Sequence, residues 1–160
     1  MVVENQDNNF ELKDADDRGA GVVCKQSFKV GQVVMRGAID EILSVNTVHT
    51  SQVGENAFVV PVGLMAFVNH CCNPNCGIQV NDTGAHDYVA MQDIAAGEEI
   101  TFDYAMQNYC VDHFPSQCMC GDKNCRGAIG GWQDLPQNKR DQYQGFIAPY
   151  LFEIDSKTNL

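Results

Sequence analysis

Eight cysteines in 160 residues are the feature that most narrows what this chain can fold into. Cysteine at this density serves either as a disulfide framework in an oxidising compartment or as metal ligands in a reducing one. Cys118, Cys120 and Cys125 form a C-x-C-x4-C pattern, and Gly121 follows where a tight turn would direct backbone amides at thiolates. The polar, acidic residues 1–7 do not resemble a secretory signal. The pattern therefore favours a zinc site over disulfides.

A tetrahedral zinc site of this kind needs a fourth thiolate from elsewhere in the chain. The adjacent Cys71 and Cys72 are poorly placed to bond to each other, and either could supply that thiolate from a distant loop. Cys24, Cys76 and Cys110 follow no ligand spacing, so we expect small buried or half-buried side chains there.

The charge balance excludes some classes of partner. There are 21 acidic and 10 basic residues, for a formal net charge of -11, which argues against direct binding of nucleic acid phosphates. An acidic surface suits a Lys/Arg-rich peptide, although it also favours solubility. The longest apolar stretch, residues 57–68, is too short to span a membrane and contains Pro61 and Gly63.

The hydrophobic pattern predicts a mostly β fold in one domain. Short apolar runs separated by turn residues are typical of strands, and only residues 136–151 have a helical pattern. We expect a loop over 46–56, one helical turn over 64–68, and a hairpin or meander from the runs 21–24 and 32–35. Further strands are expected at 10–12, 39–45, 57–60, 88–91 and 100–104.

Three longer segments carry the chemistry of the chain. Residues 69–75 read N-H-C-C-N-P-N, residues 97–104 read G-E-E-I-T-F-D-Y, and residues 118–127 read C-M-C-G-D-K-N-C-R-G. In this order they resemble the signatures of the SET-domain protein lysine methyltransferases with a post-SET zinc module. The resemblance covers roughly residues 17–132.

The resemblance implies a particular fold and domain organisation. It predicts small curved β-sheets with a pseudoknot, a C-terminal zinc-binding post-SET segment and a short helical tail. We accordingly divide the chain into a lead-in (1–16), a SET domain (17–110), a zinc module (111–132) and a helical tail (133–160).

The resemblance also implies a reaction and a set of site residues. The reaction moves a methyl group from S-adenosylmethionine to a lysine ε-amine, and Tyr104 would be the catalytic tyrosine. Ile129 or Trp132 would cover the adenine, although Trp132 could equally just pack the zinc module onto the domain. The other expected cofactor contacts are Gly19, Ala20, Gly21, Asn69 and His70, and a semi-buried His70 that only shapes its loop is the alternative.

One structural zinc ion would bind Cys72, Cys118, Cys120 and Cys125. The family's ligand from the main domain corresponds to Cys72, but Cys71 stands where serine is usual, so the two could exchange roles.

The expected lysine channel contains Phe102 and Ile78, at positions where other members carry tyrosines. Without those hydroxyls there is room for a larger amine, which favours di- or trimethylation. The chain departs from the family pattern elsewhere: Ala66 replaces an arginine, Met35–Ala38 contains no channel tyrosine, and the insert at about 44–57 is short.

We therefore expect a protein lysine methyltransferase that acts on a basic peptide, with a histone H3 tail as the leading substrate. A non-histone protein substrate and a SET-like module that binds partners without catalysis are the alternatives. The expected location is intracellular, and nuclear if the substrate is a histone. Membrane binding is not expected.

Overall fold

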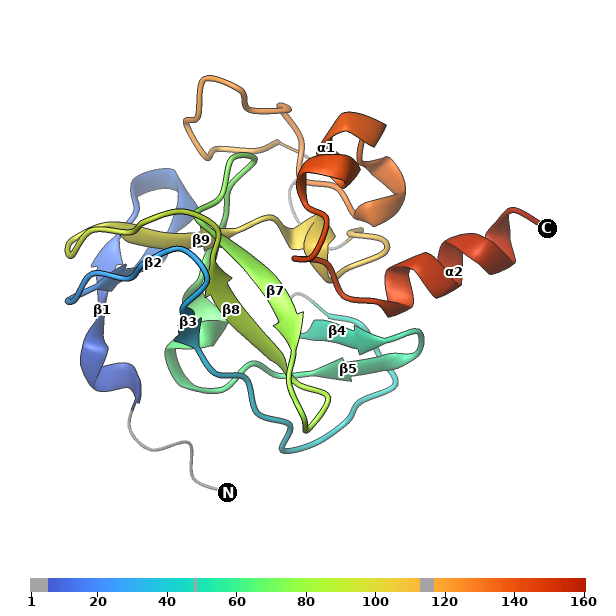
Figure 1. Cartoon of the computed structure of the whole chain (residues 1–160), viewed down its shortest axis with the longest axis horizontal. Helices are drawn as coiled ribbons and strands as arrows, with labels where there is room; N and C mark the ends of the chain where they lie inside the picture. The colour runs from blue at the N-terminus through green and yellow to red at the C-terminus, as the bar shows by residue number, and fades with distance from the viewer. Residues whose placement is uncertain (1–5, 48, 113–116) are drawn as a thin grey trace.

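The computed structural model describes residues 6–47, 49–112 and 117–160, and within them the strands form three small sheets (Figure 1). The first has the strand order β1-β2-β9-β6, the second β3-β8-β7 and the third β4-β5. The mostly β prediction is confirmed. Residues 1–5 of the predicted lead-in and 113–116 of the predicted zinc module lie outside the described residues.

The elements are short, as the turn-rich sequence predicts. Single 3-10 turns cover Gln6–Asn9, Asp16–Arg18, Gly63–Phe67, Tyr104–Met106 and Trp132–Asp134. The strands and helices are β1 (Phe10–Asp14), β2 (Ala20–Cys24), β3 (Val33–Met35), β4 (Ser51–Gly54), β5 (Ala57–Val59), β6 (Asn69–His70), β7 (Cys76–Val80), β8 (His86–Ala90), β9 (Glu99–Phe102), α1 (Gln137–Gln142) and α2 (Tyr150–Thr158).

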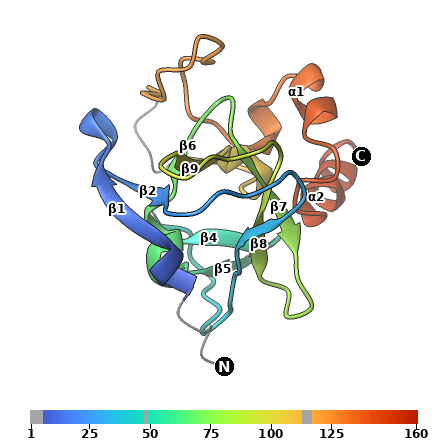
Figure 2. The same cartoon turned by 60° about the vertical axis from the view of Figure 1, so that its left-hand side comes forward.

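Two segments far apart in the sequence meet as parallel strands at the centre of the molecule. Strand β6 pairs in parallel with β9, and the loop after β6 continues across it (Figure 2). The Cys71 amide donates to the carbonyl of Phe102 at 3.1 Å, and the Asn75 side-chain amide donates to the carbonyl of Glu99 at 2.8 Å. The Thr101 amide in turn donates to Asn75 Oδ1 at 2.9 Å. This crossing holds the strand before Tyr104 in the arrangement expected from the pseudoknot.

Three sequence predictions of local structure were wrong. The runs 21–24 and 32–35 do not pair with each other, because β2 pairs with β1 and β9 whereas β3 pairs with β8. Residues 39–45 form no strand beyond an isolated bridge at Leu43, since Ile42 and Val45 face solvent and bury no apolar surface. The predicted loop 46–56 contains β4, where the Gln52 side chain is buried.

The tail is helical, but it forms two helices instead of one. Helix α1 begins directly after Pro136, as predicted, and α2 continues beyond residue 151 to Thr158 (Figure 1). The Tyr150 hydroxyl donates to the carbonyls of Gln52 in β4 and Gln107 after β9. The tail is therefore tied to the body of the domain. None of the helices in the described ranges is long and apolar enough to cross a membrane.

Candidate active site

Tyr104 stands directly after β9 and opens a 3-10 turn. Its backbone amide donates to His70 Nδ1 at 3.2 Å, and its hydroxyl donates to the Val68 carbonyl at 3.3 Å. Burial raises the pKa of Tyr104 to about 12, so the hydroxyl is neutral at physiological pH. Both contacts come from the segment around β6, so the parallel pairing of β6 with β9 fixes the position of this tyrosine.

Tyr104 lines two cavities. The first cavity has a volume of about 210 Å³ and the second about 290 Å³. The first is lined by Asp17, Arg18, Asn69, His70, Tyr104, Ile129 and the segment 117–120. The second is lined by Tyr88, Phe102, Tyr104, Val68, Gln107, Asn108 and residues of the segments 49–51, 60–61 and 65–66. A side chain that lines both cavities can contact a ligand in each of them.

Asn69 and Gly21 are packed together beside the first cavity. The Asn69 side-chain amide donates to the Ala20 carbonyl and to Glu99 Oε1, each at 3.0 Å. A Cβ on Gly21 would lie 2.5 Å from Glu99 Oε1, so a larger residue there would force the Glu99 carboxylate to shift. Gly19 has a φ of +78°, which glycine tolerates best. Gly19, Ala20 and Gly21 adjoin Arg18 but do not themselves line the cavity, so their cofactor contacts stay a prediction.

Arg18 is a residue of this cavity to which the sequence analysis assigned no role. Its guanidinium binds Glu99 through two hydrogen bonds of 3.0 and 2.8 Å, which fix its planar group at the cavity wall. The one sequence feature that could have pointed to Arg18 as a residue of this cavity is its position directly before the G-x-G of residues 19–21.

The His70 imidazole is buried and has a structural task. Burial, reinforced by the nearby Arg126 and opposed by Asp103, lowers the pKa of His70 to about 4, so the ring is neutral. Since Nδ1 accepts from the Tyr104 amide, the ring proton lies on Nε2, which is 3.4 Å from Cys72 Sγ. The imidazole thus contacts the Tyr104 amide and lies beside Cys72, and a backbone contact from His70 to a cofactor stays a prediction.

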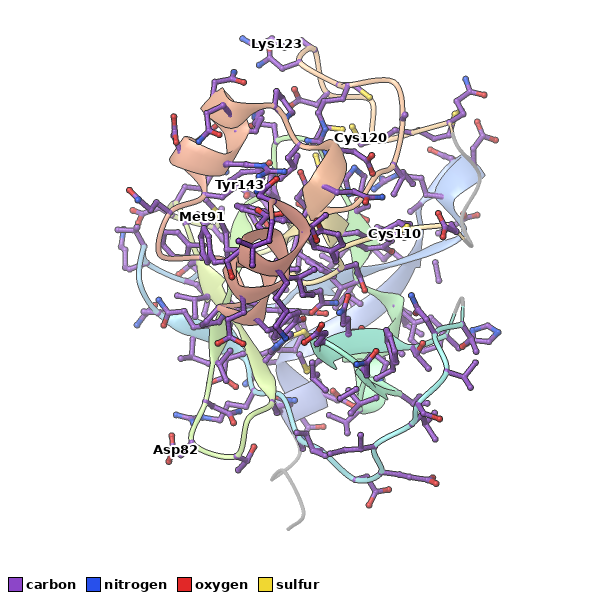
Figure 3. The ribbon with its side chains drawn as sticks, turned by 90° about the vertical axis from the view of Figure 1, so that its right-hand side faces the viewer. Asp82, Met91, Cys110, Cys120, Lys123 and Tyr143 are labelled. Atoms are coloured by element: carbon purple, nitrogen blue, oxygen red, sulfur yellow. The ribbon has the colours of Figure 1, made fainter. Side chains whose placement is uncertain are left out.

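Four cysteine sulphurs gather at the end of the molecule that carries Cys120 (Figure 3). The Sγ atoms of Cys72, Cys118, Cys120 and Cys125 all lie within 4.8 Å of one another, and Cys72 Sγ is 3.7 Å from Cys118 Sγ and 3.9 Å from Cys125 Sγ. Tetrahedral zinc with Zn–S bonds of about 2.3 Å requires sulphur separations of about 3.8 Å. The cluster therefore fits a zinc ion.

The surroundings of the cluster fit a structural zinc site. The Arg126 amide donates to Cys72 Sγ at 3.4 Å and the Gly127 amide to Cys125 Sγ at 3.3 Å. Cys71 stays outside the cluster and its sulphur accepts from the Asn73 amide. All eight cysteines are free thiols. Cys72 is thus the member of the adjacent pair that joins the cluster, and a zinc ion with four thiolate ligands has no open coordination position for catalysis.

A buried carboxylate joins the end of strand β9 to the cluster and to the tail. Asp103 has no exposed surface, and its oxygens lie 2.7 Å from Arg126 Nη1 and 2.9 Å from the Tyr143 hydroxyl. The same hydroxyl donates to the Cys72 carbonyl at 3.2 Å. The sequence analysis did not single out Asp103, Arg126 or Tyr143. The only sequence clues were that Asp103 precedes Tyr104, Arg126 follows Cys125 and Tyr143 follows α1.

Two predicted site residues do not reach the cavities. Trp132 is buried under the tail, where its indole N–H donates to Asp155 at 2.6 Å and the Arg140 guanidinium lies 4.5 Å from its ring. Of the two candidates for covering an adenine, Ile129 alone lines the first cavity. Ile78 is buried in β7, and its neighbour Tyr88 in β8 lines the second cavity in its place. Phe102 lines the second cavity, and its role in a lysine channel stays a prediction.

Comparison with known proteins finds sequences that are related to this chain. The sequence profile of the SET domain matches residues 19–105, more than half of the chain. A histone-lysine N-methyltransferase of Saccharomyces cerevisiae, H3 lysine-4 specific, is 40% identical over 70 residues, which are 42% of this chain and 6% of the yeast protein. A Mycosarcoma maydis histone-lysine N-methyltransferase, H3 lysine-36 specific, is 41% identical over 68 residues, or 41% of this chain and 7% of that one. The matched segments thus span less than a tenth of these relatives.

Solved structures share the fold. One of KRYPTONITE in complex with mCHH DNA, an H3(1-15) peptide and SAH has a TM-score of 0.60 at 25% identity, covering 76% of this chain and 29% of that one. Another, from work on the product specificity of histone lysine methyltransferases, has a TM-score of 0.58 at 26% identity and covers 75% of this chain and 56% of that one.

Proposed function

Because the chain belongs to the SET-domain family, we propose that it transfers a methyl group from S-adenosylmethionine to the ε-amine of a lysine in another protein. The observation that carries this proposal is the position of Tyr104 on the walls of both cavities. A donor in the first cavity and a lysine in the second would meet at its hydroxyl. An in-line methyl transfer needs this alignment of donor and acceptor, which can supply several kcal/mol of the barrier reduction.

The first cavity is the proposed cofactor site. Arg18 offers a fixed cation, Asn69 and His70 line the floor, and Ile129 offers an apolar surface for a base. A related structure, that of KRYPTONITE, contains SAH, the product that the donor leaves after transfer. Zinc, held by the four-cysteine cluster, would contribute stability and no catalytic step.

The second cavity is the proposed lysine channel. Transfer requires a neutral amine, whereas a free lysine titrates near 10.4. The aromatic walls formed by Tyr88 and Phe102, together with the charge of the nearby sulfonium, lower the pKa of a lysine placed there. Water removes the extra proton of the lysine amine before the transfer, so the chain needs no dedicated base. The neutral Tyr104 hydroxyl then accepts a hydrogen bond from the amine and orients it.

The proposed substrate is a basic segment of the histone H3 type. The net charge of -11 favours such a partner, and the relatives named above act on lysine 4 or lysine 36 of H3. We infer a chromatin-associated, nuclear location on the same basis. The same charge argues against direct binding of nucleic acid, although the KRYPTONITE structure contains DNA. A non-histone protein substrate is the second candidate, because the matched segment makes up less than a tenth of the histone-specific relatives.

A labelled methyl-transfer assay tests the proposal. Core histones and H3 peptides are incubated with labelled S-adenosylmethionine and either the wild-type chain or Tyr104→Phe. We expect transfer by the wild type and a loss of about 10²-fold or more in Tyr104→Phe, with SAH affinity by calorimetry unchanged. SAH binding without transfer to any protein would favour the alternative, a binding module without catalysis.

A further inference from the structure

A fifth cysteine lies beside the four-cysteine cluster. Cys71 directly precedes Cys72, and its side chain interacts with that of Cys120, another member of the cluster. The Cys71 side chain is only partly buried, so a small molecule in solvent can reach it. A tetrahedral zinc ion with four thiolates has no place for a further sulphur. Cys71 is therefore a thiol that adjoins the zinc site without being needed to form it.

Hydrogen bonds hold Cys71 against the turn that carries Cys120. The Cys71 amide donates to the carbonyl of Phe102 at 3.1 Å, which fixes the loop after β6 on β9. The side-chain amide of Asn73 donates to Asp122 Oδ2 at 3.2 Å, and these residues follow Cys71 and Cys120 at the same spacing. A bond between Cys71 and Cys120 would therefore join two segments that are already in contact.

The two sulphurs also adjoin the first cavity. The Arg18 guanidinium interacts with the side chains of both Cys71 and Cys120, and Arg18 and Cys120 line that cavity. Cys118 and Ile129 of the same module line it as well. A change in the bonding of Cys120 therefore reaches the wall of the first cavity.

This arrangement favours one oxidation reaction, with hydrogen peroxide as the oxidant. A zinc-bound cysteine is a thiolate, which is the reactive form of the side chain. Attack of the Cys120 sulphur on peroxide breaks the O–O bond, forms a sulfenic acid and releases hydroxide. The Cys71 thiol then attacks the same sulphur, an S–S bond forms, and the hydroxyl group leaves as water with the thiol proton. The two sulphurs lose two electrons, and one peroxide becomes one water and one hydroxide.

We propose that Cys71 forms a disulfide with Cys120 under oxidation and thereby releases the zinc ion in a reversible way. The inference goes beyond the proposed function, because it requires the zinc site but no methyl transfer. A sulfenic acid without a neighbouring thiol is oxidised further to a sulfinic acid, which thiol reductants do not reverse. The disulfide protects Cys120 from that fate, so a reductant can restore the thiolate and the ion can bind again.

The test follows the release of zinc and its recovery. Zinc-loaded wild-type chain, Cys71→Ser and Cys110→Ser are treated with hydrogen peroxide, and a colorimetric chelator measures the released ion. Each sample is then reduced with a thiol and given zinc again. We expect the wild type to regain close to one ion per chain. Cys71→Ser should regain less than about half of that, because its Cys120 is over-oxidised.

Cys110→Ser is the matched control. Cys110 is partly buried like Cys71, but its thiol bonds to Asp112 and it does not belong to the cluster. Its removal should leave the recovery of zinc at the wild-type level. An equal loss of recovery in Cys71→Ser and Cys110→Ser would overturn the proposal.

Mass spectrometry of the digested, oxidised wild type identifies the bond itself. We expect a peptide pair joined through Cys71 and Cys120. A disulfide between two members of the cluster that leaves Cys71 free, or equal recovery of zinc in the wild type and Cys71→Ser, overturns the proposal. If Cys71→Ser fails to fold, the peptide map of the wild type alone decides. None of these measurements uses methyl transfer, so a failure of the proposed function would leave their outcome unchanged.

Discussion

The ion pair between Asp103 and Arg126 should be a main support of the segment that joins β9 to Tyr104, and one substitution can measure this. The Asp103 side chain has no exposed surface and that of Arg126 is 18% exposed, with 2.7 Å between the closest atoms. In Asp103→Asn the shape is kept but the guanidinium loses its counter-charge in a largely water-free place. Breaking a buried pair from one side typically costs about 3 to 5 kcal/mol. For a chain of this size that corresponds to a fall in Tm of about 6 to 20 °C.

A second ion pair of the same length gives the control. Lys29 and Asp93 also approach to 2.7 Å, but their side chains are 76% and 58% exposed. Water screens such a pair, so Asp93→Asn should leave the free energy of unfolding close to that of the wild type. Both substitutions replace an aspartate by asparagine and both pairs have the same length, so the large difference in burial is the main contrast between the two sites.

The assay is urea unfolding followed by tryptophan fluorescence, with zinc in slight excess. Trp132, the single tryptophan, lies between the zinc module and the tail, so it reports on the region that Asp103 supports. If Asp103→Asn and Asp93→Asn lower the free energy of unfolding equally, the reasoning is refuted. That result would mean that distance, and not burial, sets the strength of these ion pairs.

Other predictions follow from the same geometry. Cys72→Ser should lose bound zinc and Cys71→Ser should keep one ion per chain, as counted by elemental analysis, and the reverse result would reassign the ligand. Burial lowers the pKa of His86, so protonation favours the unfolded chain, and stability should be constant above about pH 6.5 and fall below it. His86→Phe should therefore flatten Tm between pH 5 and 6.5 relative to wild type, and parallel curves would contradict this. Ile129→Ala should weaken SAH binding with little change in Tm, whereas Trp132→Phe should lower Tm and leave the SAH affinity unchanged. Calorimetry separates these two outcomes.

Local sequence motifs predicted the chemistry of the site better than its architecture. The C-x-C-x4-C spacing and the N-H-C-C run led to four sulphurs that do lie together, because ligand spacing within a tight turn is a short-range property. The choice between Cys71 and Cys72 depended on how a distant loop crosses β9. Spacing contains no information on that crossing, so the structure was needed to decide it.

The errors in the fold have a common physical cause. Runs such as 21–24 and 32–35 have strand character, but nothing in the hydrophobic pattern states which strand they pair with. The sequence analysis did not identify Tyr88 as a residue of the second cavity for the same reason, since it reaches that cavity through its place between β3 and β7. The assignment of Trp132 remained open because a large aromatic side chain packs equally well on a cofactor or on a helix, and here α2 and Arg140 cover it.

The hydroxyls of Tyr143 and Tyr150 reach back from the tail to backbone carbonyls of Cys72, Gln52 and Gln107. These contacts join residues far apart in the sequence, and such contacts require the most chain entropy to be lost before they form. A variant shortened before Tyr150 would therefore lose the tie between β4 and the segment after β9, whereas the pairing of β6 with β9 and the four-cysteine cluster would keep their own contacts.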